Sequence, residues 1–169
     1  MKVIVVAGYF RTGSTWLFNL IKHSLLSEGY TVSQAGNHEI PPPITDFHII
    51  KTHTWSQDLF WKSDYVFTSH RDLNEIKASY IRFTGVALEG PEAEQSWADY
   101  LQWNSFSNYA MPFGIMVQCP SIVANAVIYA LGLKCDPNEV LKIVSEIKPP
   151  SKGYDPDSFY YSNHITKKP

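Results

Sequence analysis

The stretch of sequence that decides the fold reads Tyr9-Phe10-Arg11-Thr12-Gly13-Ser14-Thr15-Trp16. It follows the apolar run 3–7, which is short and rich in β-branched residues and therefore typical of a buried strand. It leads into residues 15–22, whose pattern indicates a helix. A strand, a glycine-containing turn and a helix start direct backbone N–H groups and the positive end of the helix at one place. We therefore expect this loop to bind a phosphate or sulfate group.

The same loop lacks the lysine of a nucleoside-triphosphate site. From Gly8 to Thr15 the segment nearly matches G-x-x-x-x-G-K-[ST], but Ser14 stands at the lysine position and the cation, Arg11, comes earlier. In ATP- and GTP-binding proteins this lysine reaches the β- and γ-phosphates. The loop therefore predicts a nucleotide-like anion and argues against ATP or GTP.

Length and composition predict a single folded domain. The chain has 169 residues, of which 44% are hydrophobic and 18% charged, and this composition excludes a disordered chain. The formal net charge of −2 gives no overall attraction to nucleic acid or an anionic membrane. No apolar run approaches the ~20 residues of a membrane helix, and two cysteines suggest neither a disulfide framework nor a metal site. We expect a cytoplasmic protein without nucleic-acid or membrane partners.

Strand and helix signals alternate along the chain. Strands are predicted at 3–7, 30–32, 47–51 and 64–68, and helices at about 14–28, 72–82, 91–101, 120–132 and 137–147. Residues 34–46, the aromatic link 55–61 and a C-terminal tail, 149–169, are expected to be irregular. This alternation predicts one α/β domain over residues 1–169. It would have three layers, a central and mostly parallel sheet with helices on both faces, as in P-loop NTPases.

Three segments are expected to meet at one edge of that sheet, because ligands of such sheets bind outside the carboxyl ends of the strands. They are the Arg11 loop, Lys51-Thr52-His53 and Ser69-His70-Arg71. Lys51 and His53 are two residues apart in an extended chain, so their side chains point the same way. The histidine can take a proton from an attacking hydroxyl while the lysine stabilises developing charge and keeps the imidazole neutral.

Taken singly, these residues also have structural explanations. A Lys-x-His pair fits a half-exposed strand edge, and Arg71 fits the partner of a carboxylate as well as a phosphate ligand. The many aromatic side chains fit either an acceptor pocket or core packing; they include Trp55, Phe60, Trp61, Trp97, Tyr100 and Trp103.

The order and spacing of the three segments resemble the sulfotransferase family that uses 3′-phosphoadenosine 5′-phosphosulfate (PAPS). The first cofactor motif of that family, Tyr-Pro-Lys-Ser-Gly-Thr-Thr-Trp, is similar to residues 9–16, and its Lys-Thr-His element is similar to residues 51–53. Its second cofactor motif begins with an arginine and ends, eight residues later, in Ser-Tyr, as residues 71–80 do. The similar segments fall within about residues 3–83.

The resemblance implies a role for each matching residue. The 5′-phosphosulfate would be held by Arg11, Thr12, Gly13, Ser14 and Thr15. Trp16 would stack on or wall the adenine, although it also fits a core position on its helix. Arg71 and Ser79 would bind the 3′-phosphate that distinguishes PAPS from ATP. His53 would be the general base, with Lys51 and Arg11 stabilising the sulfuryl group and the leaving phosphate, and no metal is implied.

Two features depart from the family pattern. Arg11 replaces the usual lysine of the cytosolic branch; it keeps the charge and adds bidentate capacity. The chain is also shorter than typical members and lacks their late Arg-Lys-Gly-x-x-Gly segment, which closes over the 3′-phosphate. Residues 163–168 are a candidate substitute, and Glu39 is a reserve candidate for the base.

We therefore expect an enzyme that moves a sulfuryl group from PAPS to a hydroxyl of a small-molecule or carbohydrate acceptor, by in-line transfer with a histidine base. Two alternatives stay open. One is a non-catalytic module that binds PAP, the desulfated nucleotide, or another nucleotide. The other is a small P-loop kinase, which the absent loop lysine and the absent acidic metal site disfavour.

Overall fold

The computed structural model describes residues 1–36, 38, 40 and 42–147. Helices and strands follow one another in the order β1 (Lys2–Gly8), α1 (Ser14–Ser27), β2 (Val32–Ala35), β3 (Phe47–Thr52), α2 (Gln57–Lys62), β4 (Tyr65–His70), α3 (Leu73–Thr84), α4 (Pro91–Ser105), β5 (Tyr109–Pro112), α5 (Phe113–Gln118), α6 (Pro120–Ala130) and α7 (Pro137–Ser145). The predicted tail, 149–169, and Glu39 lie outside the described residues.

The five strands form one parallel sheet in the order β2-β3-β1-β4-β5. The central strand β1 pairs with β3 on one side and with β4 on the other, so that Val6 stands opposite both Lys51 and Phe67. After β1 the chain passes through α1 to β2, and after β3 it crosses to β4 on the opposite side of β1. The loop after β1 therefore lies where the strand order reverses, which is the usual ligand position in such sheets.

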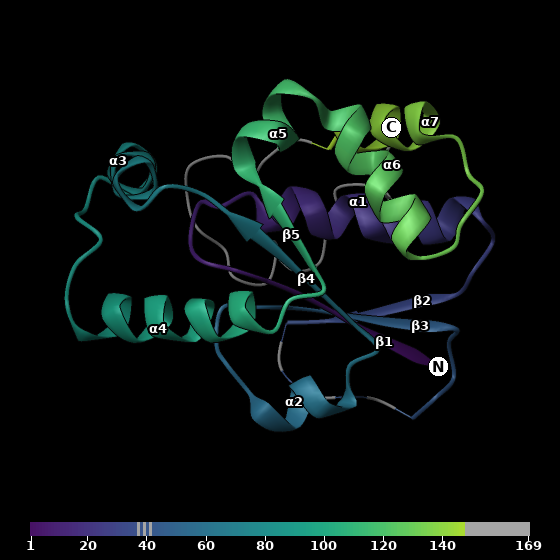
Figure 1. Cartoon of the computed structure of the whole chain (residues 1–169), viewed down its shortest axis with the longest axis horizontal. Helices are drawn as coiled ribbons and strands as arrows, with labels where there is room; N and C mark the ends of the chain where they lie inside the picture. Colours follow the sequence, from purple (N-terminus) through teal and green to yellow (C-terminus); the bar gives the residue numbers. More distant parts are fainter. Residues whose placement is uncertain (37, 39, 41, 148–169) are drawn as a thin grey trace.

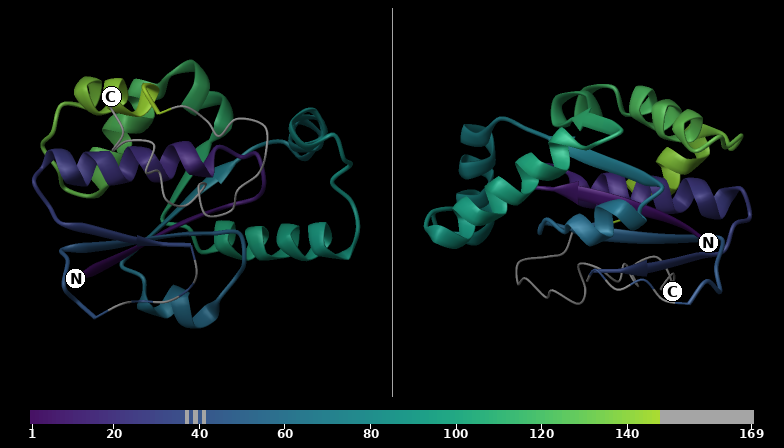
Figure 2. Two further views of the ribbon diagram at one scale, coloured as in Figure 1. Left: turned by 180° about the vertical axis from the view of Figure 1, so that it is seen from behind. Right: turned by 60° about the horizontal axis from the view of Figure 1, so that its bottom comes forward.

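Helices cover both faces of this sheet (Figure 1), which confirms the predicted three-layer α/β fold. The helices α1, α6 and α7 pack on one face, while α2 and α4 lie on the other; Figure 2 shows the same layers from behind and from below. Alternate residues of β1 enter opposite cores, because successive strand side chains point to opposite faces. Ile4 and Val6 join the larger core with α1, and Val3 and Val5 join the smaller one with Trp103.

Two predicted helix starts have the expected caps. The Asp72 side chain accepts hydrogen bonds from the backbone N–H groups of Asn74 and Glu75, and that of Asp136 accepts one from Asn138. Such caps satisfy N–H groups that have no partner inside the helix. The start of α3, directly after β4, is thereby fixed beside the loop that follows β1.

Other elements differ from the prediction. The second strand lies at Val32–Ala35 instead of 30–32, and the link 55–61 contains α2, whose N-cap Ser56 accepts from the Leu59 N–H. The short elements β5 and α5 were not predicted, because four and six residues are too few to show a reliable period. Among the described residues, no helix combines the length and apolar character needed to cross a membrane.

Candidate active site

The loop between β1 and α1 forms an anion-binding geometry at the carboxyl edge of the sheet. Helix α1 begins at Ser14, and its N-cap Gly13 has a φ of 89°, a left-handed conformation that glycine adopts without strain. Within the described residues no side chain caps this helix. The N–H groups of the first turn, which includes Ser14 and Thr15, are therefore directed at the site together with the positive helix end.

Backbone strain and buried hydrogen bonds hold this loop in shape. Arg11 has a φ of 61°, the one positive φ outside glycine in the described chain, and such strain is common at ligand sites. The fully buried Thr12 side chain donates to the Tyr9 carbonyl at 2.8 Å and its Oγ1 lies 2.7 Å from Ser69 Oγ. A Cβ at Gly8 would stand 2.6 Å from the same Ser69 oxygen, so only glycine fits there. The Thr12 side chain thus shapes the loop.

Lys51 and His53 lie together at the end of β3, as their spacing predicts. Lys51 Nζ is 3.3 Å from His53 Nε2, and His53 Nδ1 contacts the carbonyl oxygen of Gly8. A carbonyl oxygen only accepts, so Nδ1 carries the hydrogen and Nε2 presents its lone pair to Lys51. The basic nitrogen of His53 is therefore already positioned beside a cation, directly below the anion loop.

Burial perturbs both groups strongly. Only 1% of Lys51 is exposed, and burial lowers the pKa of its ammonium from 10.5 to about 7. Burial and, second, the charge of Lys51 lower the pKa of His53 to about 3, against the opposing effect of its bond to Gly8. His53 is therefore neutral at pH 7, while Lys51 titrates near neutrality. A bound anion would favour the charged form of both.

The buried lysine makes the stability of the protein depend on pH. Between pH 7 and 10.5 the unfolded chain binds a proton at Lys51 that the native protein has lost, so the free energy of unfolding should rise with pH across this window. In Lys51→Met this contribution should be absent. Urea denaturation at pH 7 and pH 9 measures the difference, and an equal pH dependence in both proteins would show that Lys51 keeps its ordinary pKa.

A second basic cluster lies beside the loop, at the start and middle of α3. The Arg71 guanidinium donates to Glu75 Oε2 at 3.0 Å and to the carbonyl oxygen of Arg11 at 3.2 Å. The Arg11 side chain turns to α3, where Nε lies 3.4 Å from the buried Ser79 hydroxyl. Arg71 and Ser79, the residues assigned to a 3′-phosphate, are thus joined through Arg11, whose carbonyl contacts the first and whose side chain contacts the second.

A pocket of about 600 Å³ opens next to both sites. Its lining includes Gly13 and Trp16 at the start of α1 and Phe113 and Met116 of α5. The remaining lining comes from Val117, Pro120 and α7, including Leu141 and Lys142. Trp16 is half-buried, lines this pocket and also packs on the larger core; its contact with an adenine stays a prediction. The Arg71 guanidinium lies 4.1 Å from the centre of the Phe113 ring. The ring thus connects the pocket to the basic cluster.

The pocket residues of α5 were not identified as candidates from the sequence. A Cβ at Gly13 would stand 3.0 Å from both Met116 and Phe113, so α5 packs directly on the anion loop. Neither residue belongs to a recognisable motif, and the helix that carries them spans six residues. The sequence hint of this region is the short apolar run around Met111. In the structure this run forms β5, which pairs with β4 and leads directly into α5.

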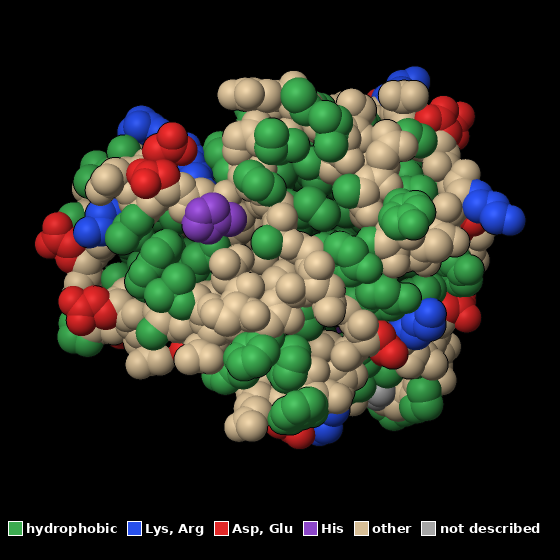
Figure 3. Space-filling model, viewed as in Figure 1, with side chains coloured by type: hydrophobic (Ala, Val, Ile, Leu, Met, Phe, Trp, Pro, Cys, Tyr) green, Lys and Arg blue, Asp and Glu red, His purple; other side chains and the backbone are tan. Residues whose placement is uncertain are grey.

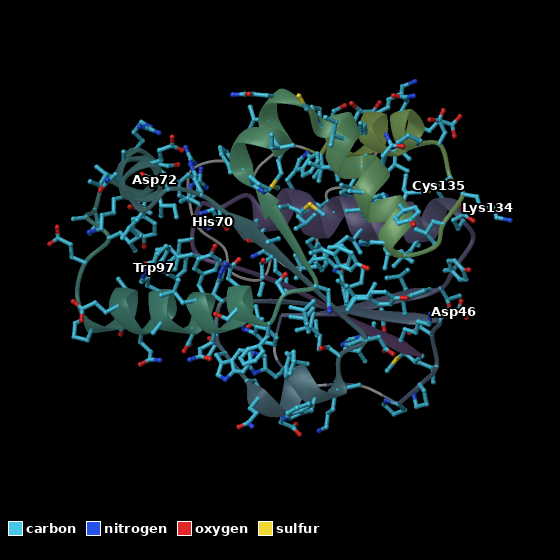
Figure 4. All side chains as sticks on the ribbon, in the orientation of Figure 1. Asp46, His70, Asp72, Trp97, Lys134 and Cys135 are labelled. Atoms are coloured by element: carbon cyan, nitrogen blue, oxygen red, sulfur yellow. The ribbon has the colours of Figure 1, made fainter. Side chains whose placement is uncertain are left out.

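Other candidate residues have contacts of their own. His70 Nδ1 is 2.6 Å from the hydroxyl of the buried Tyr100, and His70 lies between α3 and α4 near Trp97 (Figure 4). Figure 3 shows a histidine side chain at the surface of this face. Among the aromatic candidates for an acceptor pocket, Tyr100 and Trp103 are core residues, whereas 75% of Trp61 is exposed. The aromatic neighbour of His53 is Phe10, with ring centres 4.9 Å apart.

The fold is that of an α/β protein, in which a glycine-containing loop after the central strand leads into an uncapped helix start. No family model and no curated protein sequence matches the chain. It is similar to a solved structure described as retinol dehydratase in complex with androsterone and the inactive cofactor PAP. The TM-score is 0.56 at 10% sequence identity, and the similarity covers 88% of this chain. This chain spans 65% of the length of that protein. Similarity at this identity concerns the fold.

Proposed function

We propose that this protein is a sulfotransferase that moves a sulfuryl group from PAPS to an acceptor hydroxyl. The observation that carries this proposal is a single pocket flanked by two anion sites. Gly13, at the open helix start, and Phe113 both line this pocket, and the Arg71 guanidinium lies over the Phe113 ring. An adenosine bearing one anionic group at each end has the matching chemistry.

Each part of the nucleotide has a candidate partner. The purine would occupy the pocket that Trp16 and Phe113 line, because aromatic side chains favour stacking. The 5′-phosphosulfate would lie on the first turn of α1 and on the backbone of residues 11–15. The 3′-phosphate would be held by Arg71 and Ser79 through charge-assisted hydrogen bonds. The similar retinol dehydratase structure contains PAP, which supports this choice of nucleotide.

The buried pair at the end of β3 would perform the transfer. PAPS supplies an activated sulfuryl group, whose bond to the phosphate oxygen breaks as the acceptor oxygen bonds to sulfur. His53 would take the hydroxyl proton at Nε2, because Nδ1 already carries the hydrogen bonded to Gly8. Lys51 would move from Nε2 to the sulfuryl or leaving phosphate oxygens, which exposes the base and stabilises the growing charge in one motion.

The test of this function is PAPS-dependent sulfation of a panel of phenols, sugars and lipid alcohols, followed by the release of PAP. Release should require an acceptor and should proceed without added metal. PAP binding without sulfation of any acceptor would favour a non-catalytic nucleotide-binding module. Phosphorylation of an acceptor by ATP–Mg²⁺ would instead identify a kinase.

Arg71 should distinguish nucleotides by their 3′-phosphate. Arg71→Ala should weaken PAP binding by roughly 1.5–3 kcal/mol, the range for a hydrogen bond to a charged group. Adenosine 5′-phosphosulfate lacks the 3′-phosphate, so its affinity should change far less. Titration calorimetry of both ligands measures the difference. An equal loss for both would assign Arg71 to holding the loop, through its bond to the Arg11 carbonyl.

A further inference from the structure

The side chain of Arg11 lies against helix α3. Its Nε lies 3.4 Å from Ser79 Oγ, and its guanidinium lies 4.4 Å from the centre of the Phe83 ring. Ser79 and Phe83 are both on α3, one turn apart, so they form one continuous surface of that helix. The Arg11 side chain is thus fixed on α3 by two separate contacts.

The same surface of α3 carries another arginine, Arg82. It follows Ser79 by three residues, a spacing that places side chains side by side on a helix. Burial, and then the charges of Arg71 and Arg82, lower the pKa of Arg11. Arg71 and Arg82 are therefore both close enough to Arg11 to repel its charge.

This cluster has more positive than negative charge. In the described part of the chain, the salt bridge between Arg71 and Glu75 is the one ion pair that any of the three arginines makes. A phosphate dianion between them would replace repulsion by attraction and accept several charge-assisted hydrogen bonds. A guanidinium also binds phosphate in a bidentate manner, which an ammonium does not.

We propose that Arg11 and Arg82 complete the 3′-phosphate site with Arg71 and Ser79. Arg11 then recognises the nucleotide instead of acting on the sulfuryl group, and Lys51 is the cation of the transfer step. The identity of the ligand rests on the proposed function. The placement of Arg11 rests on its contacts with α3, and that of Arg82 on its position in that helix three residues after Ser79, independently of that function.

The experiment is titration calorimetry of PAP and AMP, without metal, on the parent protein and three variants. Arg82→Met and Arg11→Met should each weaken PAP binding about tenfold or more and change AMP binding little, because AMP has no 3′-phosphate. Lys77→Met is the matched control, since Lys77 is exposed on α3 but two residues from Ser79 and so on another face. It should leave both affinities unchanged. Circular dichroism melting confirms that each variant is folded.

The outcomes separate this inference from the function on which it rests. If the parent prefers PAP to AMP and Arg82→Met keeps that preference, the assignment of Arg82 is wrong while the nucleotide site stands. If Arg11→Met keeps the preference but loses turnover, Arg11 belongs to the transfer step and its assignment is wrong. If the parent shows no preference for PAP, the proposed function fails. The PAP affinity of the Arg82 variant should also fall less steeply with added salt.

Discussion

Replacement of His53 by alanine is expected to lower sulfation turnover about 10²–10⁴-fold, the usual contribution of a positioned proton acceptor. PAP affinity should change little, because the imidazole contacts Gly8 and Lys51 and would touch the acceptor but not the nucleotide. Turnover with saturating PAPS, together with PAP titration, measures the two effects separately. The turnover of the parent should rise with pH as His53 loses its proton, with a midpoint below 6.5, because burial and the charge of Lys51 lower the pKa of His53.

The matched control is His70→Ala. His70 is also a histidine at the end of a sheet strand, but it is exposed and its Nδ1 contacts the Tyr100 hydroxyl instead of the loop backbone. Its removal should leave turnover nearly unchanged. Full activity in His53→Ala with a large loss in His70→Ala would transfer the role of base to His70 and would contradict the mechanism.

Replacement of Lys51 by methionine is expected to lower turnover about 10²–10³-fold, the effect of removing one group that stabilises transition-state charge. Methionine is similar in length and fits a buried site, so the variant should remain folded. In the parent, an anion beside Lys51 should raise its pKa from about 7, so PAP binding near pH 8 should take up a proton.

Calorimetry of PAP binding in two buffers of different ionisation enthalpy measures that proton. Lys51→Met should bind PAP without proton uptake. Unchanged turnover in this variant, or proton uptake equal to that of the parent, would show that Lys51 does not face the bound anion.

Much of the fold follows from residues 3–83. The apolar run of β1, the glycine in the loop, and the capping side chain of Asp72 are local signals, and each produced the expected element. The neighbourhood of Lys51 and His53 with the loop was also predictable, because parallel strands bring their carboxyl ends to one edge. The sequence predicted less well those strands whose bounds depend on pairing with a neighbouring strand. The four-residue β2 and β5 are edge strands whose bounds are set by β3 and β4.

Details of the site depended on tertiary contacts that a linear pattern does not contain. The motif places Arg11 in the loop, but the direction of its side chain depends on Ser79 and Phe83, which lie about 70 residues later. The role of Phe113 depends on its contacts with Gly13 and Arg71. The low pKa of Lys51 arises from burial, which its neighbours in sequence do not reveal.

The most direct test of the nucleotide assignment is a competition between PAP and ATP. Titration calorimetry should show that PAP binds without metal and more tightly than ATP, with or without Mg²⁺, because the site provides for a 3′-phosphate and lacks the lysine that reaches a γ-phosphate. At a hundred times its Kd, PAP should add about 2.7 kcal/mol to the free energy of unfolding. Binding of ATP–Mg²⁺ as tightly as PAP would contradict the assignment and favour a kinase.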